Sequence, residues 1–178
     1  MTKYIAAPTG RLSPMGEEEL IVSKTDPKGR INYVNSLFLT IADYSEREVV
    51  GQPHSVIRHP DMPRCIFKLL WDTISAGSEL FAYVMNRTKF GDHYWVLAHV
   101  TPMRDDSGAV FGYHSSRRSP DRAALATIQP LYARLLAEEK RHANDKEGLA
   151  ASAAMLATAL KDHGLRYDQF IFSTLDGH

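Results

Sequence analysis

The pattern of apolar and polar positions predicts a β-hairpin near the start of the chain. Residues 1–16 contain several Pro and Gly and no sustained period, so we expect an N-terminal arm there. Residues 20–22 form a short apolar run, and residues 30–34 alternate at first between polar and apolar side chains, as a half-buried strand does. The four residues 26–29 between them, Asp-Pro-Lys-Gly, have the composition of a type I turn.

Two short helices are predicted after this hairpin. Apolar residues at helical spacing predict a helix over residues 35–42, for which Asn35 is a suitable N-cap. The amide of Asn35 could instead face a ligand beneath the helix, and both roles stay open at this point. Ser45 is suited to cap a second, very short helix before Gly51 breaks the pattern.

A longer amphipathic helix is predicted after Pro63, a residue type favoured at the first helical position. One apolar stripe runs along it and includes Phe67 and Trp71, which predicts that both rings face the core. Gly77 has the character of the residue that follows a helix end.

Three further strands are predicted at residues 80–88, 93–103 and 109–118, separated by two turns. Together with the first hairpin they make five antiparallel strands, with the short helices inserted between the second and the third. Because those helices must cover one face of the sheet, the fold class is a two-layer α+β domain.

Two helices are predicted after the last strand. Residues 119–121, Ser-Pro-Asp, signal a helix start with Ser as N-cap, and Pro130 should kink or restart that helix. Residues 144–148 indicate a break, and a second amphipathic helix covers residues 149–160. The apolar residues 170–172 should dock, on this chain or on a partner. We expect an N-terminal arm over 1–18, a sensor domain over 19–119, and a C-terminal helical output and dimerisation extension over 120–178.

The segment from Gln52 to Pro63 combines two His, one Arg and one Asp with three Pro. Each Pro disfavours helical geometry in the residue before it, so a stiff, irregular loop with at most a turn or two of helix is expected. Stiff polar loops on a packed scaffold often carry binding sites. Taken alone, the segment is equally compatible with a solvated Pro-rich turn.

Composition narrows the possible functions. The chain has 178 residues, 44% of them apolar, and a formal net charge of zero, so no overall field attracts nucleic acid. A single Cys excludes a disulfide framework and suits a reducing compartment. The longest nearly apolar run is too short to cross a bilayer. We expect a cytoplasmic protein without membrane insertion.

No catalytic or metal-binding motif is present, so we expect no enzyme and no metal site.

Several motifs between Val22 and Tyr132 carry a more specific signal. They are Gly51-Gln52-Pro53-His54, Arg58-His59-Pro60-Asp61-Met62-Pro63, Asn86-Arg87, Gly91-Asp92-His93-Tyr94-Trp95-Val96 and Pro130-Leu131-Tyr132. In these motifs the chain resembles the PAS sensory domain of the aerotaxis receptor family. The resemblance implies a PAS fold that binds FAD non-covalently and reports its redox state to a chemotaxis signalling module. It also implies a flavin ligand and a receptor or signalling partner. The two C-terminal helices could fold back as a hairpin or pair across a dimer, and we expect a homodimer.

The resemblance assigns roles to particular residues. It implies that Arg58, His59 and Asp61 are needed to retain FAD and that His54 and Arg117 sense its redox state. The amide of Asn86 could pair with the donor–acceptor edge of a flavin. The remaining expected cofactor-site residues are Asn35, Phe67, Trp71, Leu80 and Tyr94.

One of these positions departs from the family. Leu80 stands where the family has a Trp that lines the flavin ring. The adjacent Phe81 could replace that ring only if the strand shifted by one residue, and such a shift would reverse the face to which each side chain points.

Three alternative functions remain open. A haem-binding PAS gas sensor would use a His such as His54 or His59 as its proximal ligand. A cofactor-free PAS domain would serve protein contact alone. A blue-light receptor of the LOV type needs a Cys in the loop after Gly51, whereas Cys65 lies beyond that loop.

Overall fold

The computed structural model describes residues 6–175. Its elements in chain order are β1 (Ile21–Thr25), β2 (Ile31–Val34), α1 (Ser36–Ala42), α2 (Glu46–Val49), the 3-10 helix η1 (His54–Ile57), α3 (Arg64–Ser75), β3 (Leu80–Arg87), β4 (His93–Arg104), β5 (Val110–Arg118), α4 (Arg122–Lys140), α5 (Asp145–Asp162) and α6 (Tyr167–Ser173). The predicted strands and helices are all present, with ends shifted by one or a few residues.

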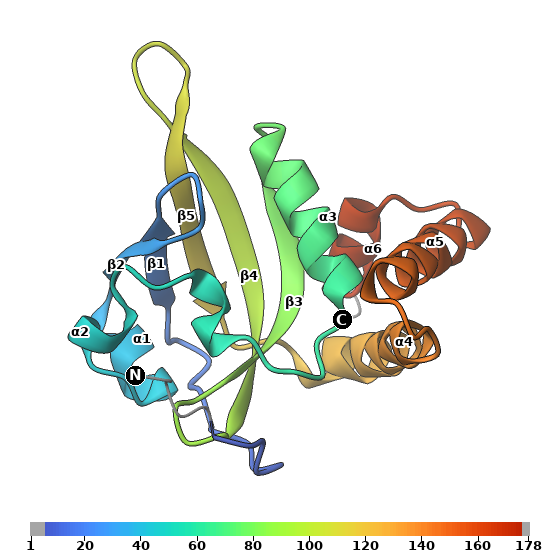
Figure 1. Cartoon of the computed structure of the whole chain (residues 1–178), viewed down its shortest axis with the longest axis horizontal. Helices are drawn as coiled ribbons and strands as arrows, with labels where there is room; N and C mark the ends of the chain where they lie inside the picture. The colour runs from blue at the N-terminus through green and yellow to red at the C-terminus, as the bar shows by residue number, and fades with distance from the viewer. Residues whose placement is uncertain (1–5, 176–178) are drawn as a thin grey trace.

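The five strands form one antiparallel sheet in the order β2-β1-β5-β4-β3. Helices α1, α2 and α3 and the segment around η1 lie along one side of it, and the β4–β5 turn projects away from the rest of the molecule (Figure 1). The predicted α+β fold with short helices over one face of the sheet is therefore confirmed, and α4 and α6 contact part of the other face. Strand β5 returns to pair with β1, which brings the last strand into the middle of the sheet.

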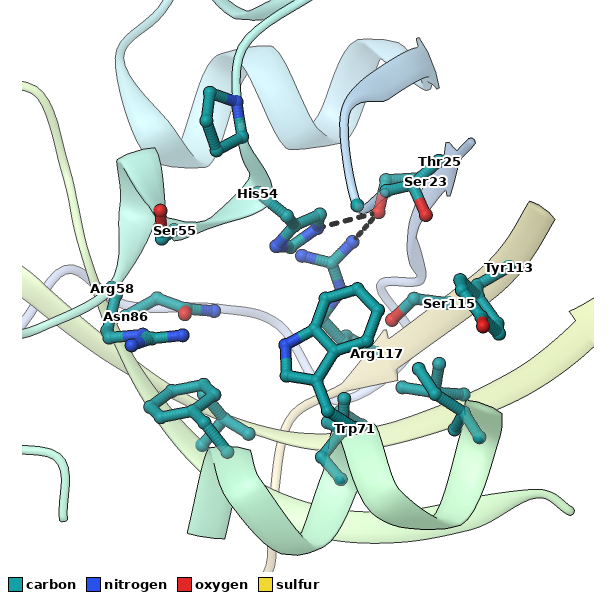
Figure 2. Close-up of a pocket in the computed structure, with 18 of the residues that line it drawn as sticks. Ser23, Thr25, His54, Ser55, Arg58, Trp71, Asn86, Tyr113, Ser115 and Arg117 are labelled. Carbon is teal, nitrogen blue, oxygen red and sulfur yellow. Dashed lines mark hydrogen bonds between the residues drawn. The ribbon is translucent and has the colours of Figure 1, made fainter. Parts of the chain in front are cut away.

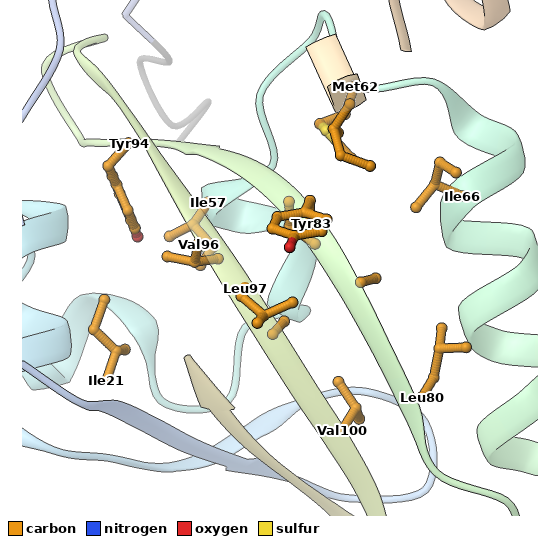
Figure 3. Close-up of a cluster of buried hydrophobic side chains, with 14 of the residues drawn as sticks. Ile21, Ile57, Met62, Ile66, Leu80, Tyr83, Tyr94, Val96, Leu97 and Val100 are labelled. Carbon is orange, nitrogen blue, oxygen red and sulfur yellow. The ribbon is translucent and has the colours of Figure 1, made fainter. Parts of the chain in front are cut away.

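Strand alternation divides the side chains between two faces of the sheet. On β4, Tyr94 is buried on the face toward α1 and α3, whereas Trp95 lies on the other face near Tyr132 of α4. Apolar side chains from both faces contribute to one buried cluster, in which Val96 and Leu97 are consecutive residues (Figure 3). Helices contact both faces here, so most of β3 is buried, and on β4 the buried run is its middle, Val96 to Ala98.

The C-terminal helices pack on this same chain, beyond the β3 edge and next to α3 (Figure 1). Within α6, Ile171 is fully buried and Phe172 contacts the ring of Phe81. Thr174, which follows α6, hydrogen-bonds to the hydroxyl of Tyr83, 2.9 Å away. Residues 170–172 therefore dock, as expected, and their partner is the sheet of the same chain.

Two details of α4 differ from the prediction. Asp121, not Ser119, is the N-cap, and its carboxylate accepts a hydrogen bond from the Ala123 N–H at 2.7 Å. Helix α4 begins at Arg122, so Ser119 lies too far before its first turn to cap it. Pro130 lies inside α4 without dividing it, so the helix is not restarted at that residue.

A buried carboxylate joins α4 and α5 to the start of α3. Glu139 is 4% exposed and accepts hydrogen bonds from the Cys65 N–H at 3.0 Å, from Arg64 Nε at 3.1 Å and from Ser152 Oγ at 2.8 Å. An anion is favourable at a helix N-terminus, where N–H groups lack partners within the helix. Gly148 completes the contact, because a Cβ there would lie 2.6 Å from the Glu139 carbonyl oxygen.

Candidate functional site

A cavity of about 190 Å³ lies between α3, the η1 segment and the inner face of the sheet. Its polar lining comprises Ser23, Thr25, Lys28, His54, Ser55, Arg58, Asn86, Ser115 and Arg117. Its apolar lining includes Phe67, Leu70, Trp71, Ile74, Val84, Ala98, Val100 and Tyr113. An apolar pocket with a few convergent polar groups is the usual form of a small-molecule site.

Arg117, Ser23 and His54 form a connected polar group on one side of this cavity (Figure 2). The Arg117 guanidinium donates to Ser23 Oγ, which lies 3.0 Å from His54 Nε2. Because a guanidinium can only donate, the Ser23 hydroxyl proton remains available for His54 Nε2, an acceptor in the neutral imidazole.

Burial sets the protonation of both ionisable groups. Arg117 is 2% exposed, and burial lowers its pKa to about 10, so it keeps its charge at neutral pH. Burial, reinforced by the nearby charge of Arg117, lowers the pKa of His54 to about 3. His54 is therefore a neutral hydrogen-bonding group next to a buried cation.

Arg58 faces the cavity from the opposite side, beside Asn86 (Figure 2). Its guanidinium lies 3.6 Å from the centroid of the Phe67 ring, a cation–π contact that orients the group. The backbone of Arg58 forms an antiparallel bridge with Asn86, so the loop after η1 is held against β3. Desolvation lowers the pKa of Arg58.

Three buried N–H donors in this site have no hydrogen-bond partner among residues 6–175. They are Arg58 Nε, Arg117 Nε and Arg117 Nη1. A buried donor without a partner costs free energy, about 1–3 kcal/mol and more when it is charged. Such donors on two sides of one cavity fit a ligand that presents several acceptor atoms.

Aromatic side chains close the end of the cavity near the first hairpin. The rings of Trp71 and Tyr113 meet edge to face with centroids 5.6 Å apart. The indole lies directly over Gly29, where a Cβ would be 2.7 Å from Trp71 Cη2 and where φ is +77°. The turn needs glycine both for this backbone conformation and for the approach of the ring.

The structure brings together about half of the residues that the sequence placed in the site. Those that line the cavity are His54, Arg58, Phe67, Trp71, Asn86 and Arg117. Those that do not line it are Asn35, His59, Asp61, Leu80 and Tyr94. Each residue of the second set has a structural reason for its position.

The Asn35 side chain hydrogen-bonds to the backbone around it. Its side-chain oxygen accepts hydrogen bonds from the N–H groups of Phe38 and Val22, both at 3.1 Å, and its amide donates to the Leu20 carbonyl at 2.8 Å. Of the two roles left open by the sequence, the structure shows the helix cap. The same side chain also hydrogen-bonds to the backbone at the start of β1.

His59 and Asp61 lie outside the cavity. Arg58 is in an extended conformation, so the residue after it points the other way, and His59 is buried near the ring of His93. The His59 Nδ1 atom accepts from the Asp61 N–H at 3.1 Å. The Asp61 carboxylate lies 3.7 Å from Lys140 Nζ. These two residues shape the loop and connect it to the end of α4.

Strand register explains the positions of Leu80 and Tyr94. Leu80 pairs with Val100 and is buried on the cavity's side of β3, but beyond the cavity wall. Phe81 points to the opposite face, where it stacks on His99 with centroids 4.0 Å apart, so it does not replace the ring expected at Leu80. Tyr94 pairs with Asn86 on the neighbouring strand and is buried. Burial raises the pKa of the Tyr94 hydroxyl.

Sequence reasoning missed most of the site residues that come from β1 and β5. Ser23, Thr25, Ser115 and Tyr113 line the cavity from β1 and β5. Strand alternation contained the signal, because Tyr113 and Ser115 share a face with Arg117, and Ser23 pairs with Ser115.

Comparison with known proteins agrees with this architecture. Residues 31–117 match the family described as the PAS fold. The aerotaxis receptor of Escherichia coli (strain K12) is 37% identical over 124 residues, which cover 70% of this chain and 24% of the receptor. Phototropin-2 of Oryza sativa subsp. japonica is 31% identical over 102 residues, which cover 57% of this chain and 11% of that protein.

A solved structure shows the same fold. The LOV domain of the blue-light photoreceptor Aureochrome1, in its dark structure, has a TM-score of 0.53 at 25% identity and covers 68% of this chain and 84% of that chain. The chain spans about a quarter of the length of the aerotaxis receptor. It therefore contains a PAS domain, and this domain resembles that of the aerotaxis receptor.

Proposed function

We propose that this PAS domain binds FAD non-covalently in the cavity between α3 and the sheet and reports its redox state. The observation that carries the proposal is that Arg58 and Arg117, which both line this cavity, carry three buried guanidinium N–H donors without a partner among the described residues. The flavin ring presents carbonyl oxygens and ring nitrogens as acceptors. The flat aromatic and apolar walls suit the rest of the ring.

Different residues of the cavity would make the polar and the apolar contacts with such a ring. Arg58 and Asn86 offer donors from one side, and the carboxamide of Asn86 can both donate and accept. Phe67 and Trp71 supply apolar and aromatic surface from α3. When bound, FAD supplies reversible reduction, and the protein supplies its orientation and its electrostatic surroundings.

We assign the sensing role to Arg117. A reduced flavin carries more negative charge than an oxidised one, and a buried cation stabilises that charge strongly where the local dielectric is low. Arg117 shares its contacts with Ser23 and His54, so a change in its position alters that hydrogen-bonded group. It is also the second-last residue of β5, which leads through Ser119 and Pro120 into α4. A local electrostatic change therefore has a short path to the C-terminal helices.

In this proposal residues 19–119 are the sensor and residues 120–178 transmit its output. A signalling module or chemotaxis receptor is the proposed partner, in the cytoplasm, and the homodimer predicted from the sequence stays part of the proposal. Among the described helices, none has the length and apolar character required to cross a membrane.

The test of cofactor binding is the absorption spectrum of the purified protein, with the released cofactor identified by chromatography against FAD, FMN and haem. We expect the two absorption bands of a flavin and the release of FAD at close to one per chain. A Soret band would replace the proposal by a haem sensor. Protein that stays colourless after incubation with FAD would leave a PAS domain used for protein contact.

The test of the Arg117 role is limited proteolysis of the C-terminal helices in the oxidised and the reduced protein. We expect wild-type protein to be cleaved at different rates in the two states, because a change at Arg117 alters the end of β5. Arg117→Ala should remove this difference, whereas Arg118→Ala, at the exposed neighbouring position, should retain it. Equal rates in oxidised and reduced wild-type protein would contradict the proposed route.

A further inference from the structure

A second cavity, of about 530 Å³, lies on the other side of the η1 segment. Its walls come from Ala6 in the N-terminal arm, from α2 and the residue Tyr44 before it, from the start of η1 and from the turn between β3 and β4. Pro53 and Ser55 line both cavities, whereas His54 between them lines only the first. The two cavities are therefore neighbours, with this short segment between them.

The size of the first cavity requires part of FAD to lie elsewhere. Sites for drug-sized ligands have volumes of about 300–1,000 Å³, and the first cavity has about 190 Å³. FAD consists of a flavin ring joined through a ribityl chain to an adenosine diphosphate. The diphosphate and the adenosine must leave the cavity that holds the ring, and the second cavity is next to it.

The second cavity has the chemistry that an adenosine diphosphate requires. Arg87 and Lys89 supply cationic donors, and Tyr44 and Phe90 supply aromatic surface; Phe90 is 62% exposed. Among residues 6–175, the one hydrogen bond of the Arg87 side chain runs to the Ala6 carbonyl at 3.5 Å, the outer limit for such a bond. A guanidinium held this loosely is available for a phosphate, which it binds in bidentate fashion.

The acidic residue in this cavity does not oppose an anion by itself. The Glu48 carboxylate accepts from Lys89 Nζ at 2.6 Å and from the backbone and side chain of Ser45, both at 2.9 Å. The hydrogen bond from Lys89, with those from Ser45, lowers the Glu48 pKa to about 2. Lys89 therefore compensates Glu48, and Arg87 leaves a net positive charge on this wall.

We propose that the second cavity binds the adenosine diphosphate part of FAD, with the diphosphate against Arg87 and the adenine between Tyr44 and Phe90. The inference rests on the proposed function and extends it, because it explains a preference for FAD over shorter flavins. It also gives the segment 53–55 a role as the crossing point between the two halves of the ligand.

The test compares the affinities of FAD, FMN and riboflavin for wild-type protein and for three variants, measured by quenching of flavin fluorescence. We expect wild-type protein to prefer FAD over riboflavin. Arg87→Gln should lower the affinity for FAD about tenfold to a hundredfold, the value of one charge-assisted hydrogen-bonded contact, and leave riboflavin binding unchanged. Arg47→Gln, which removes an exposed cation of α2 that lines neither cavity, should retain the preference.

Other outcomes would overturn the inference. Equal affinities of wild-type protein for FAD and riboflavin, or a preference that survives Arg87→Gln, would show that the second cavity holds no part of the ligand. Loss of the preference in Lys28→Gln instead would place the diphosphate at the opposite rim of the first cavity. Riboflavin binding in each case shows that the ring site is intact, whereas failure to bind any flavin would refute the proposed function as well.

Discussion

Arg58→Ala is expected to lower the affinity of the protein for FAD by about a hundredfold while the protein stays folded. Arg58 is a charged donor in the cavity wall, it is oriented by its contact with Phe67, and its Nε atom has no partner among the described residues. Loss of a charge-assisted hydrogen bond of this kind weakens binding by about 1.5–3 kcal/mol. Arg58 is only half-buried, and the contact that its side chain gives up is the one with Phe67, so the larger loss should appear in binding.

The measurement is the amount of FAD that remains after gel filtration, together with circular dichroism to verify folding. Asp61→Ala is the informative companion. The family resemblance expects it to lose FAD as Arg58→Ala does, whereas the structure places Asp61 only against His59 and Lys140, outside the cavity. We expect a smaller loss for Asp61→Ala. Full retention of FAD by Arg58→Ala would refute the role of this cavity wall.

Glu139→Ala is expected to lower the free energy of unfolding by about 3 kcal/mol. The substitution leaves the Cys65 N–H, Ser152 Oγ and the Arg64 guanidinium without their common acceptor, and breaking a buried charged contact costs about 3–5 kcal/mol. The lower end applies because Arg64 remains one-third exposed and keeps its contact with Asp145.

Urea unfolding of both variants and of wild-type protein measures this cost. Glu138→Ala is the matched control, because Glu138 pairs only with Arg141 and His142 within the described residues, both at the end of its own helix. It should cost less than about 1 kcal/mol. If Glu139→Ala lowered the free energy of unfolding as little as Glu138→Ala does, the proposed stabilising contact between Glu139 and the start of α3 would be contradicted.

Much of the secondary structure could be predicted because its causes are local. The alternation in β2 and β4, the cap at Asn35 and the turn at Gly29 depend on residues within a few positions of one another. The Asp121 cap shows the limit of this reasoning, since Ser119 and Asp121 are both suitable N-caps and the local sequence did not decide between them.

The site could be predicted only in part. Arg58, Asn86 and Arg117 were identified because charged or amide side chains in a loop or on a strand have few structural uses. His59 was also expected there, yet the extended backbone at Arg58 turns it to the other side. Which of two neighbouring polar residues faces a cavity depends on strand pairing, and the bridge between Arg58 and Asn86 joins residues far apart in the chain.

The sequence by itself determined the five strands, the helices between them and the chemical character of the loop before α3, because those depend on local periodicity and backbone preference. Only the tertiary structure decided that Ser23 connects Arg117 to His54, that Glu139 holds the start of α3, and that α6 covers the sheet of its own chain. Periodicity shows which side chains share a face of an element, but the partner that covers that face is selected by packing among residues distant in sequence.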